Sequence, residues 1–270
     1  MHRQRVGWDE LPLPLREAVA ARTGPVRFAR TVSGGFNSTL AVVLDTPGGR
    51  VFVKGLRGDH RGVVTQGREA LINAAVRPVA PALLWHLPDV AGWNVLGFEY
   101  VEGRHADYRP GSPDVTAVVA VLDALAGVPC PDVPGVKDAS RWRCYADSGD
   151  TTPFEGDALL HTDWKPDNVL IQADGTVRVV DWAWPTRGAA WIDPADLLIQ
   201  LIANGHTPAQ AETHMNRVRG WQQAPVSSVN SFCRANVRLW DEIVGNNPTP
   251  WHQNMARAAR SWAQTRLAAI

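Results

Sequence analysis

The middle of the chain carries the run His161-Thr162-Asp163-Trp164-Lys165-Pro166-Asp167-Asn168. It is followed by Val177-Arg178-Val179-Val180-Asp181, an apolar strand pattern that ends in an aspartate. The spacing His161-x-Asp163-x-x-x-x-Asn168 would occur by chance in roughly 3% of chains of this length, and the downstream aspartate lowers that chance further. The surrounding pattern predicts a short strand over 158–160 and a hairpin of strands over 168–172 and 176–180.

Three polar side chains of this region have the chemistry that phosphoryl transfer requires. A polyphosphate carries several negative charges, and the Mg²⁺ ion that balances them prefers oxygen ligands in octahedral geometry. Asn168 and Asp181 offer such oxygens from the two ends of the predicted hairpin. Asp163 lies on the preceding loop, from which its carboxylate can orient an acceptor hydroxyl and accept its proton. The pattern therefore predicts a site for phosphoryl transfer from a polyphosphate with Mg²⁺.

This segment resembles the catalytic loop and metal loop shared by protein kinases and the aminoglycoside phosphotransferase / choline kinase-like family, a bacterial phosphotransferase enzyme family. The resemblance implies ATP as the phosphoryl donor, Asp163 as the catalytic base, Asn168 as a metal ligand and Asp181 as the main metal ligand. Trp182 after the aspartate is more typical of the aminoglycoside phosphotransferase group. Lys165 followed by proline is typical of serine/threonine protein kinases, which makes Lys165 a candidate catalytic residue that contacts the transferred phosphate.

The N-terminal third contains a second part of the resemblance. Ser33, Gly34 and Gly35 lie between two predicted strands and resemble the nucleotide-covering loop of that family, although they depart from the Gly-x-Gly-x-x-Gly of protein kinases. Alone this pattern is more often a simple hairpin. Lys54 ends the next strand, where the family places its phosphate-binding lysine, and Glu69 on the following helix would be its ion-pair partner. Without this context both side chains would be interpreted as surface charges.

The stretch 96–103 resembles the hinge between the two lobes of such a kinase. By that likeness the Glu99 carbonyl and the Val101 amide would bind the adenine edge, and Phe98 would line the pocket. The alternative interpretation is a buried strand with an incidental glutamate. Farther along, Asp193 matches a family segment in which the aspartate braces the catalytic loop by hydrogen bonds, and His161 is predicted to pack beneath the metal loop.

The predicted elements divide into a sheet-rich N-terminal third and a mostly helical remainder, which gives an α+β, bilobal, protein-kinase-like fold. We expect an N-lobe over 1–101 and a C-lobe over 102–270. The N-lobe comprises helices over 14–22 and 65–76 and strands over 26–32, 40–44, 50–54, 83–87 and 93–100. The C-lobe begins with an apolar helix over 115–126 and a loop-rich stretch over 128–156, and it is helical from residue 194 onward.

Composition excludes several other classes of protein. The 270 residues contain 27 lysines and arginines against 27 aspartates and glutamates, so the basic excess that nucleic-acid or anionic-membrane binding requires is missing. Three cysteines without a Cys-x-x-Cys pair make a disulfide framework or a zinc site improbable. No apolar run reaches the length of a membrane span, and the first residues lack a signal-peptide core. We therefore expect a cytoplasmic protein without nucleic-acid or membrane partners. The sequence indicates no particular oligomeric state.

The sequence leaves the acceptor open between an aminoglycoside-like antibiotic and another small hydroxylated metabolite. A polycationic aminoglycoside requires clustered carboxylates. Residues 102–157 have ten acidic against five basic side chains, whereas residues 197–270 have three against seven. One rival interpretation is a serine/threonine protein kinase, but the chain between Asp181 and Asp193 is too short for a full activation segment. The other rival is a non-catalytic nucleotide-binding regulator.

Overall fold

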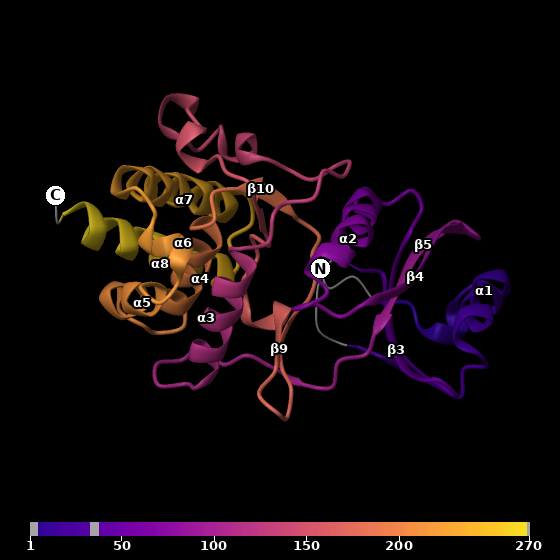
Figure 1. Ribbon diagram of the computed structural model, residues 1–270. Coiled ribbons are helices and arrows are strands. Elements are labelled where there is room, and N and C mark those ends of the chain that lie inside the picture. The colour runs from indigo at the N-terminus through magenta and orange to yellow at the C-terminus, as the bar shows by residue number, and fades with distance from the viewer. Residues whose placement is uncertain (1–4, 33–37, 269–270) are drawn as a thin grey trace.

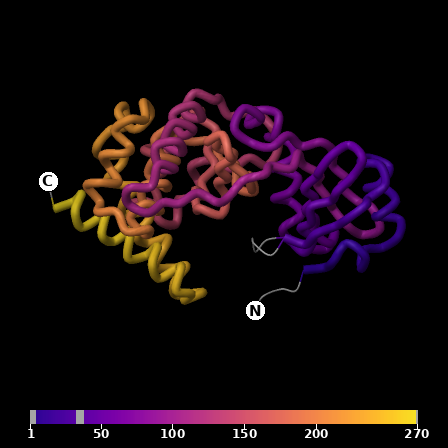
Figure 2. The backbone as a smooth tube through the Cα atoms, turned by 90° about the horizontal axis from the view of Figure 1, so that it is seen from below, coloured from indigo at the N-terminus to yellow at the C-terminus, as the bar shows by residue number. Residues whose placement is uncertain are grey.

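Two parts can be distinguished in the computed structural model, which describes residues 5–32 and 38–268 (Figure 1, Figure 2). The N-terminal part is a β-sheet with two helices, and the C-terminal part is larger and mostly helical. This arrangement confirms the α+β, bilobal fold predicted from the sequence. The predicted nucleotide-covering residues Ser33, Gly34 and Gly35 lie outside the described residues.

The N-terminal sheet is antiparallel throughout, with its five strands in the order β1-β2-β3-β5-β4. Every predicted strand and helix of this part is present, and no predicted end differs from the observed one by more than three residues, which is within the usual uncertainty of element ends. The elements are η1 (Trp8–Glu10), α1 (Leu13–Thr23), β1 (Phe28–Thr31), β2 (Leu40–Thr46), β3 (Gly49–Arg57), α2 (Val63–Val76), β4 (Leu83–Val90) and β5 (Trp93–Glu99).

The register of this sheet places the residues of the predicted nucleotide site on two central strands. On β3, Lys54 pairs with Ala41 of β2 and with Leu96 of β5. On β5, Phe98 pairs with Phe52. β2 and β5 are buried along almost their whole length, because α1 and α2 pack against the sheet. Central position and burial fix the backbone of β3 at Lys54.

The C-terminal part contains six α-helices among its described residues, joined to two small sheets that carry the loops of interest. The helices are α3 (Asp114–Leu125), α4 (Ile192–Ala203), α5 (Pro208–Met215), α6 (Arg219–Gln222), α7 (Val226–Asn246) and α8 (Pro250–Leu267). The strands are β6 (Arg104–His105), β7 (Ala158–Leu160), β8 (Val169–Ile171), β9 (Val177–Val179) and β10 (Thr186–Gly188). β8 and β9 form the predicted hairpin, and β10 pairs with β7.

Two of these strands were not predicted. β6 and β10 contain two and three residues, which is too short for an alternating pattern, and both form only by pairing with strands distant in sequence. The loop-rich stretch 128–156 also contains three short 3₁₀-helices: η2 (Ala139–Trp142), η3 (Asp147–Gly149) and η4 (Thr152–Phe154).

The stretch 128–156 is fastened to α7 by charge and by aromatic packing. Asp147 forms ion pairs with Arg234 at 2.6 Å and with Arg238 at 2.7 Å. The hydrogen bonds from Arg234, opposed by partial burial and supported by Arg238, hold the pKa of Asp147 at about 2. Phe154 and Phe232 pack edge to face with a centroid distance of 5.3 Å. In Figure 1 this stretch lies over the helical part and extends toward α2.

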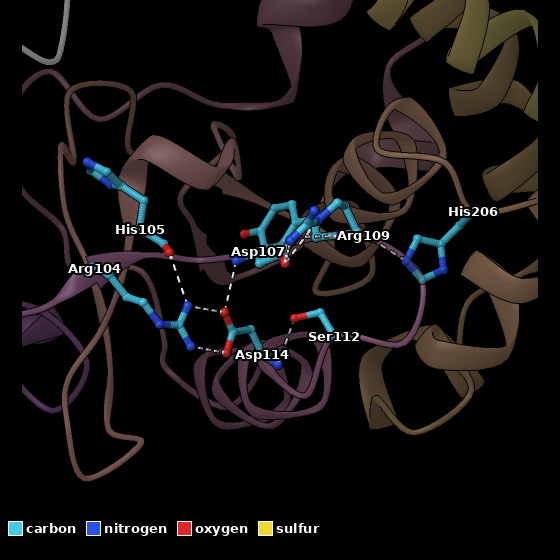
Figure 3. Close-up of polar contacts among 8 residues, drawn as sticks. Arg104, His105, Asp107, Arg109, Ser112, Asp114 and His206 are labelled. Atoms are coloured by element: carbon cyan, nitrogen blue, oxygen red, sulfur yellow. Dashed lines mark hydrogen bonds and ion pairs between the residues drawn. The ribbon is translucent and has the colours of Figure 1, made fainter.

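The chain leaves the sheet part through β6 and enters α3 by way of a polar turn (Figure 3). Arg104 Nη2 donates to Asp114 Oδ1 at 2.8 Å, and the Asp107 amide donates to Asp114 Oδ2 at 2.9 Å. His206, which precedes α5, contacts the carbonyl of Tyr108 through its ring Nε2 at 3.0 Å. These bonds fix the start of α3 against the rest of the helical part. Within the described residues, no helix is long and apolar enough to cross a membrane.

We predict that Gly97→Ala destabilises the N-terminal sheet. A methyl group on Gly97 would overlap the indole ring of Trp85 on β4, and relieving such an overlap costs about 1–3 kcal/mol. Urea unfolding should therefore show a lower midpoint than in the parent protein. Gly67→Ala in α2 is the control, because an added methyl meets no heavy atom within 4 Å there, and alanine in a helix interior is favourable by about 1 kcal/mol. Equal midpoints for the two variants would contradict the packing described.

Candidate active site

The centre of the site is Lys54 on β3, which lies between two carboxylates from distant parts of the chain. Its Nζ is 2.6 Å from Glu69 Oε2 on α2 and 3.0 Å from Asp181 Oδ1, which follows β9. The Lys54–Glu69 ion pair predicted from the sequence is therefore present. The side chains of Lys54 and Glu69 are only 9% and 5% exposed, whereas Asp181 remains 26% exposed. Through Asp181, the lysine connects the sheet part to the helical part.

Charge and burial act against each other in this group. Burial alone would lower the pKa of Lys54, but the charges of Asp181 and Glu69 raise it above its ordinary value. Burial raises the pKa of Glu69, and Lys54 offsets this only in part. For Asp181, burial acts in the same upward direction, yet the charge and hydrogen bond of Lys54 outweigh it and leave the pKa lowered. Lys54 is therefore held as a cation and Asp181 as an anion.

The predicted catalytic residues form a second group on the loop before β8. Lys165 Nζ donates to Asp163 Oδ2 at 3.1 Å, and Asn168 Nδ2 donates to the same oxygen at 2.8 Å. Asn168 Nδ2 also donates to the Asp163 carbonyl at 2.9 Å, which closes the loop on itself around the short helix η5 (Pro166–Asn168). Lys165 also helps to lower the pKa of Asp181, so the two groups influence each other.

The loop that carries Asp163 is held by a buried carboxylate. Asp193 accepts the amide of His161 at 2.8 Å and the amide of Thr162 at 2.9 Å, which are the hydrogen bonds that the sequence predicted for Asp193. Burial raises the pKa of Asp193 despite these bonds. Thr162 has φ +61° and Asp181 has φ +63°, conformations that L-residues seldom adopt. Backbone strain of this kind is concentrated at functional sites.

His161 packs beneath the metal loop, as predicted. Its ring Nε2 contacts the Val180 carbonyl at 3.0 Å, and the ring meets the Trp182 indole edge to face with a centroid distance of 4.7 Å. Trp182 itself donates from Nε1 to the Val179 carbonyl at 3.1 Å. These contacts fix the residues on both sides of Asp181 and so determine where its carboxylate points.

The predicted hinge residues end β5 beside Lys54. The Phe98 ring is buried, and the Lys54 Nζ lies 5.7 Å from its centroid. The Glu99 amide donates to the Ala82 carbonyl at 2.9 Å, and its side chain turns back to the Ala82 amide at 3.3 Å. Val101 lies just beyond the strand, where the chain leaves the sheet. Phe98 thus lies next to the Lys54 ammonium group. The adenine contacts of Glu99 and Val101 remain a prediction.

The oxygens that remain free fit a Mg²⁺ ion together with a polyphosphate. Within the described residues, Asn168 Oδ1 and Asp181 Oδ2 accept no hydrogen bond. No cluster of three or more His, Cys, Asp or Glu side chains that could hold a metal occurs in that same part of the chain. Mg²⁺ commonly takes only one or two protein oxygens and completes its shell with phosphate and water, so this donor set suits it.

Two residues of the site were missed by the sequence interpretation. Arg141 Nη1 donates to Thr162 Oγ1 at 2.7 Å and to Thr186 Oγ1 at 2.6 Å, and it lies 3.4 Å from the Trp184 carbonyl. Tyr108 is buried, its hydroxyl has no partner within the described residues, and burial together with the charges of Asp114 and Asp163 raises its pKa. Arg141 and Tyr108 lie in stretches that contain no recognisable sequence motif, so there was no reason in the sequence to single them out.

Comparison with solved structures shows which proteins share this fold. Choline kinase LicA from Streptococcus pneumoniae matches 93% of this chain and 98% of its own with a TM-score of 0.65 and 14% identity. An aminoglycoside phosphotransferase from Alicyclobacillus acidocaldarius matches 97% and 96% with a TM-score of 0.61 and 14% identity. A thermostable mutant of aminoglycoside phosphotransferase APH(4)-Ia, solved with ADP and hygromycin B, matches 92% and 98% with a TM-score of 0.58 and 15% identity.

No protein-family model and no curated protein matches the chain. The structural matches each span almost the whole chain, so both parts of the molecule share the fold of these proteins. The chain therefore has the kinase-like fold of choline kinase and the aminoglycoside phosphotransferases, which confirms the resemblance to that family at the level of fold.

We predict that Glu69→Gln lowers the free energy of unfolding by about 2 kcal/mol. This is less than the roughly 3–5 kcal/mol that a fully orphaned buried charge costs, because Asp181 still faces Lys54. Glu102→Gln is the matched control. Glu102 pairs with Arg50 at 3.4 Å with side chains 81% and 50% exposed, and such a pair contributes about 0–1 kcal/mol. Chemical denaturation measures the free energy of unfolding of both variants. Equal decreases in this free energy would show that the buried Lys54–Glu69 pair contributes no more to stability than the exposed Arg50–Glu102 pair.

Proposed function

We propose that the protein is a phosphotransferase that moves the γ-phosphoryl group of ATP to a hydroxyl group of a small molecule, with Mg²⁺ as cofactor. The observation that supports this most directly is the joining of Glu69, Lys54 and Asp181 across the two parts of the fold. In a kinase the lysine and the glutamate must pair, and the metal-loop aspartate must be in place, before phosphoryl transfer can occur.

Each side chain of the site has a distinct proposed role. Lys54 would neutralise phosphate charge of the nucleotide, and Asn168 Oδ1 and Asp181 Oδ2 would hold Mg²⁺, which balances charge on the polyphosphate when bound. Phe98 would line the adenine pocket, with main-chain contacts from Glu99 and Val101. Ser33, Gly34 and Gly35 are proposed to cover the phosphates of the nucleotide.

Asp163 is proposed as the catalytic base. Its Oδ2 is occupied by Lys165 and Asn168, whereas its Oδ1 accepts no hydrogen bond within the described residues. The free Oδ1 can accept the proton of an acceptor hydroxyl as the hydroxyl oxygen bonds the γ-phosphorus and the bond to the ADP oxygen breaks. Lys165, held 3.1 Å from this carboxylate, is positioned to stabilise the charge of the transferred group.

A small-molecule acceptor is favoured over a protein substrate by the length of the chain after the metal loop. Only ten residues separate Asp181 from the start of α4 at Ile192, and three of them form β10 against β7. This leaves no room for the long segment on which protein kinases dock a peptide. We place the division of the chain into an N-lobe (1–101) and a C-lobe (102–270) at the turn between β5 and β6.

We predict that Asp163→Ala reduces turnover by about 10²–10⁴-fold while Mg²⁺-ATP affinity is kept, because the base acts on the acceptor and not on the nucleotide. Release of ADP, with water or a screened alcohol as acceptor, measures turnover, and calorimetry measures affinity. Asp167→Ala is the control, since Asp167 is an exposed aspartate of the same loop. Full activity in Asp163→Ala would rule out the assigned role.

A second prediction concerns the metal loop. At a hundredfold excess over its dissociation constant, Mg²⁺-ATP should stabilise the parent protein against thermal unfolding by about 2.7 kcal/mol. Asp181→Ala should lose this stabilisation, because it removes the main proposed metal ligand, and Asp167→Ala should retain it. A parent protein that does not respond to nucleotide would favour a non-catalytic role, and a full response in Asp181→Ala would exclude the metal assignment.

A further inference from the structure

Two cations of the stretch 128–156 gather around one exposed tryptophan beside the proposed active site. Lys137 Nζ lies 4.6 Å from the centroid of the Trp184 ring, and the Arg141 guanidinium carbon lies 6.0 Å from the same ring. Trp184 comes three residues after Asp181, and its ring side chain is 37% exposed. Arg141 also lies 5.1 Å from the ring of Trp142. The planar rings thus hold both cations at the surface of the site.

A third cation reaches the same place from the N-terminal part. Arg68 is on α2, and its side chain passes so close to Gly135 that a methyl group there would lie 3.3 Å from Arg68 Nε. The Arg68 Nε is buried and has no hydrogen-bond partner within the described residues. Burial first, and then the charges of Arg141 and Arg68, lower the pKa of Lys137. We call Arg68, Lys137 and Arg141 the cationic cluster.

The cationic cluster has no close counter-charge, because the acids whose charges act on Arg141, namely Asp196, Asp193 and Asp163, form no ion pair with it in the described residues. None of its three residues forms an ion pair with a carboxylate in residues 5–32 and 38–268, although all three are half-buried. Half-buried cations that repel one another are unfavourable unless an anion joins them.

The acidic side chains nearby in sequence are occupied elsewhere. Of the ten in residues 102–157, seven pair with arginines outside the cationic cluster: Glu102, Asp107, Asp114, Asp123, Asp132, Asp147 and Asp157. These seven carboxylates are paired with other cations, and none of the ten forms an ion pair with a residue of the cationic cluster in the described residues.

The cationic cluster is connected to the catalytic loop by direct contacts. Arg141 donates to the hydroxyl of Thr162, the residue directly before Asp163. The charge of Asp163 acts to raise the pKa of Arg141. Arg68 directly precedes Glu69, the partner of Lys54. An anion held by the cluster would therefore be connected, through Arg141 and Thr162, to the loop that carries Asp163.

We propose that the cationic cluster is the recognition site for an anionic group of the acceptor, so that the substrate is a small hydroxylated molecule that carries a carboxylate or a phosphate. This inference rests on the proposed function, because it places the acceptor at Asp163. The anion is held by Arg68, Lys137 and Arg141, which come from both parts of the fold, where α2 lies against the stretch 128–156. Cationic acceptors such as aminoglycosides are repelled by the same charges.

Direct binding of inorganic phosphate tests the cationic cluster without knowledge of the acceptor. Phosphate is titrated at constant ionic strength into the parent protein and into Arg68→Met, Lys137→Met and Arg257→Met. Each methionine removes one charge and keeps a long side chain. Arg68 and Lys137 are chosen because neither donates a side-chain hydrogen bond to another described residue, so both variants should fold. Arg257, exposed on α8, is the control for loss of charge.

We expect affinity for phosphate to fall roughly 10- to 100-fold in Arg68→Met and Lys137→Met, because each variant loses about one hydrogen bond to a charged group, and to be unchanged in Arg257→Met. Unaltered binding in the first two variants would overturn the proposal, since phosphate would then bind elsewhere on the protein. Absence of binding to the parent protein would overturn it as well. Malonate, titrated in parallel, distinguishes a carboxylate site from a phosphate site.

The same samples separate the two proposals. If Mg²⁺-ATP fails to stabilise the parent protein, the phosphotransferase function fails while phosphate binding at the cationic cluster remains measurable. An acceptor identified by screening alcohols adds a second readout: an anionic acceptor should show a raised KM and a retained kcat in Lys137→Met. A cationic acceptor whose KM is unaffected by that change would overturn the proposal.

Discussion

A buried lysine between two carboxylates is the interaction on which the arrangement of the two parts depends. Lys54 comes from the sheet, Glu69 from α2, and Asp181 from the loop after β9. If any of the three elements were displaced, a buried charge would lose its partner, at a cost of several kcal/mol. The position of α2 against the sheet and the closeness of the helical part to β3 are therefore fixed by the same ammonium group.

The catalytic loop depends on a different constraint, which is hydrogen bonding of its backbone. Thr162 and Asp181 both adopt positive φ, and the surroundings have to hold them in that conformation. Asp193 does so for the first by accepting two amides of the loop, and the packing of His161 against Trp182 does so for the second. Both supports are buried, so they hold the exposed carboxylate groups of the site in fixed positions.

The charges around these buried supports bear on acceptor recognition, whereas the fold is shared with other proteins. Burial strongly raises the pKa of Asp196, and the neighbouring Asp193 raises it further, whereas Arg141 lowers it. Arg141 therefore faces buried acids on one side and Thr162, Trp184 and the other two cations on the other. The fold alone does not determine the acceptor, and the residues that we propose to distinguish acceptors by charge belong to the stretch 128–156 and to α2.

The sequence by itself determined most of the elements and the two groups of residues that we propose for catalysis. Alternating and helical periodicities are local, so the strands and helices of the N-terminal part, the β8–β9 hairpin, α3 and the helical character of the chain after residue 194 could be predicted. The spacing of Asp163, Asn168 and Asp181 is also local, and the partnership of Lys54 with Glu69 followed from the resemblance. The tertiary structure alone decided the two short strands β6 and β10, the role of Arg141, and the gathering of Arg68 with Lys137. The physical reason is that these features consist of contacts between residues far apart in the chain, which carry no pattern until the chain folds and which depend on where neighbouring charges find their partners.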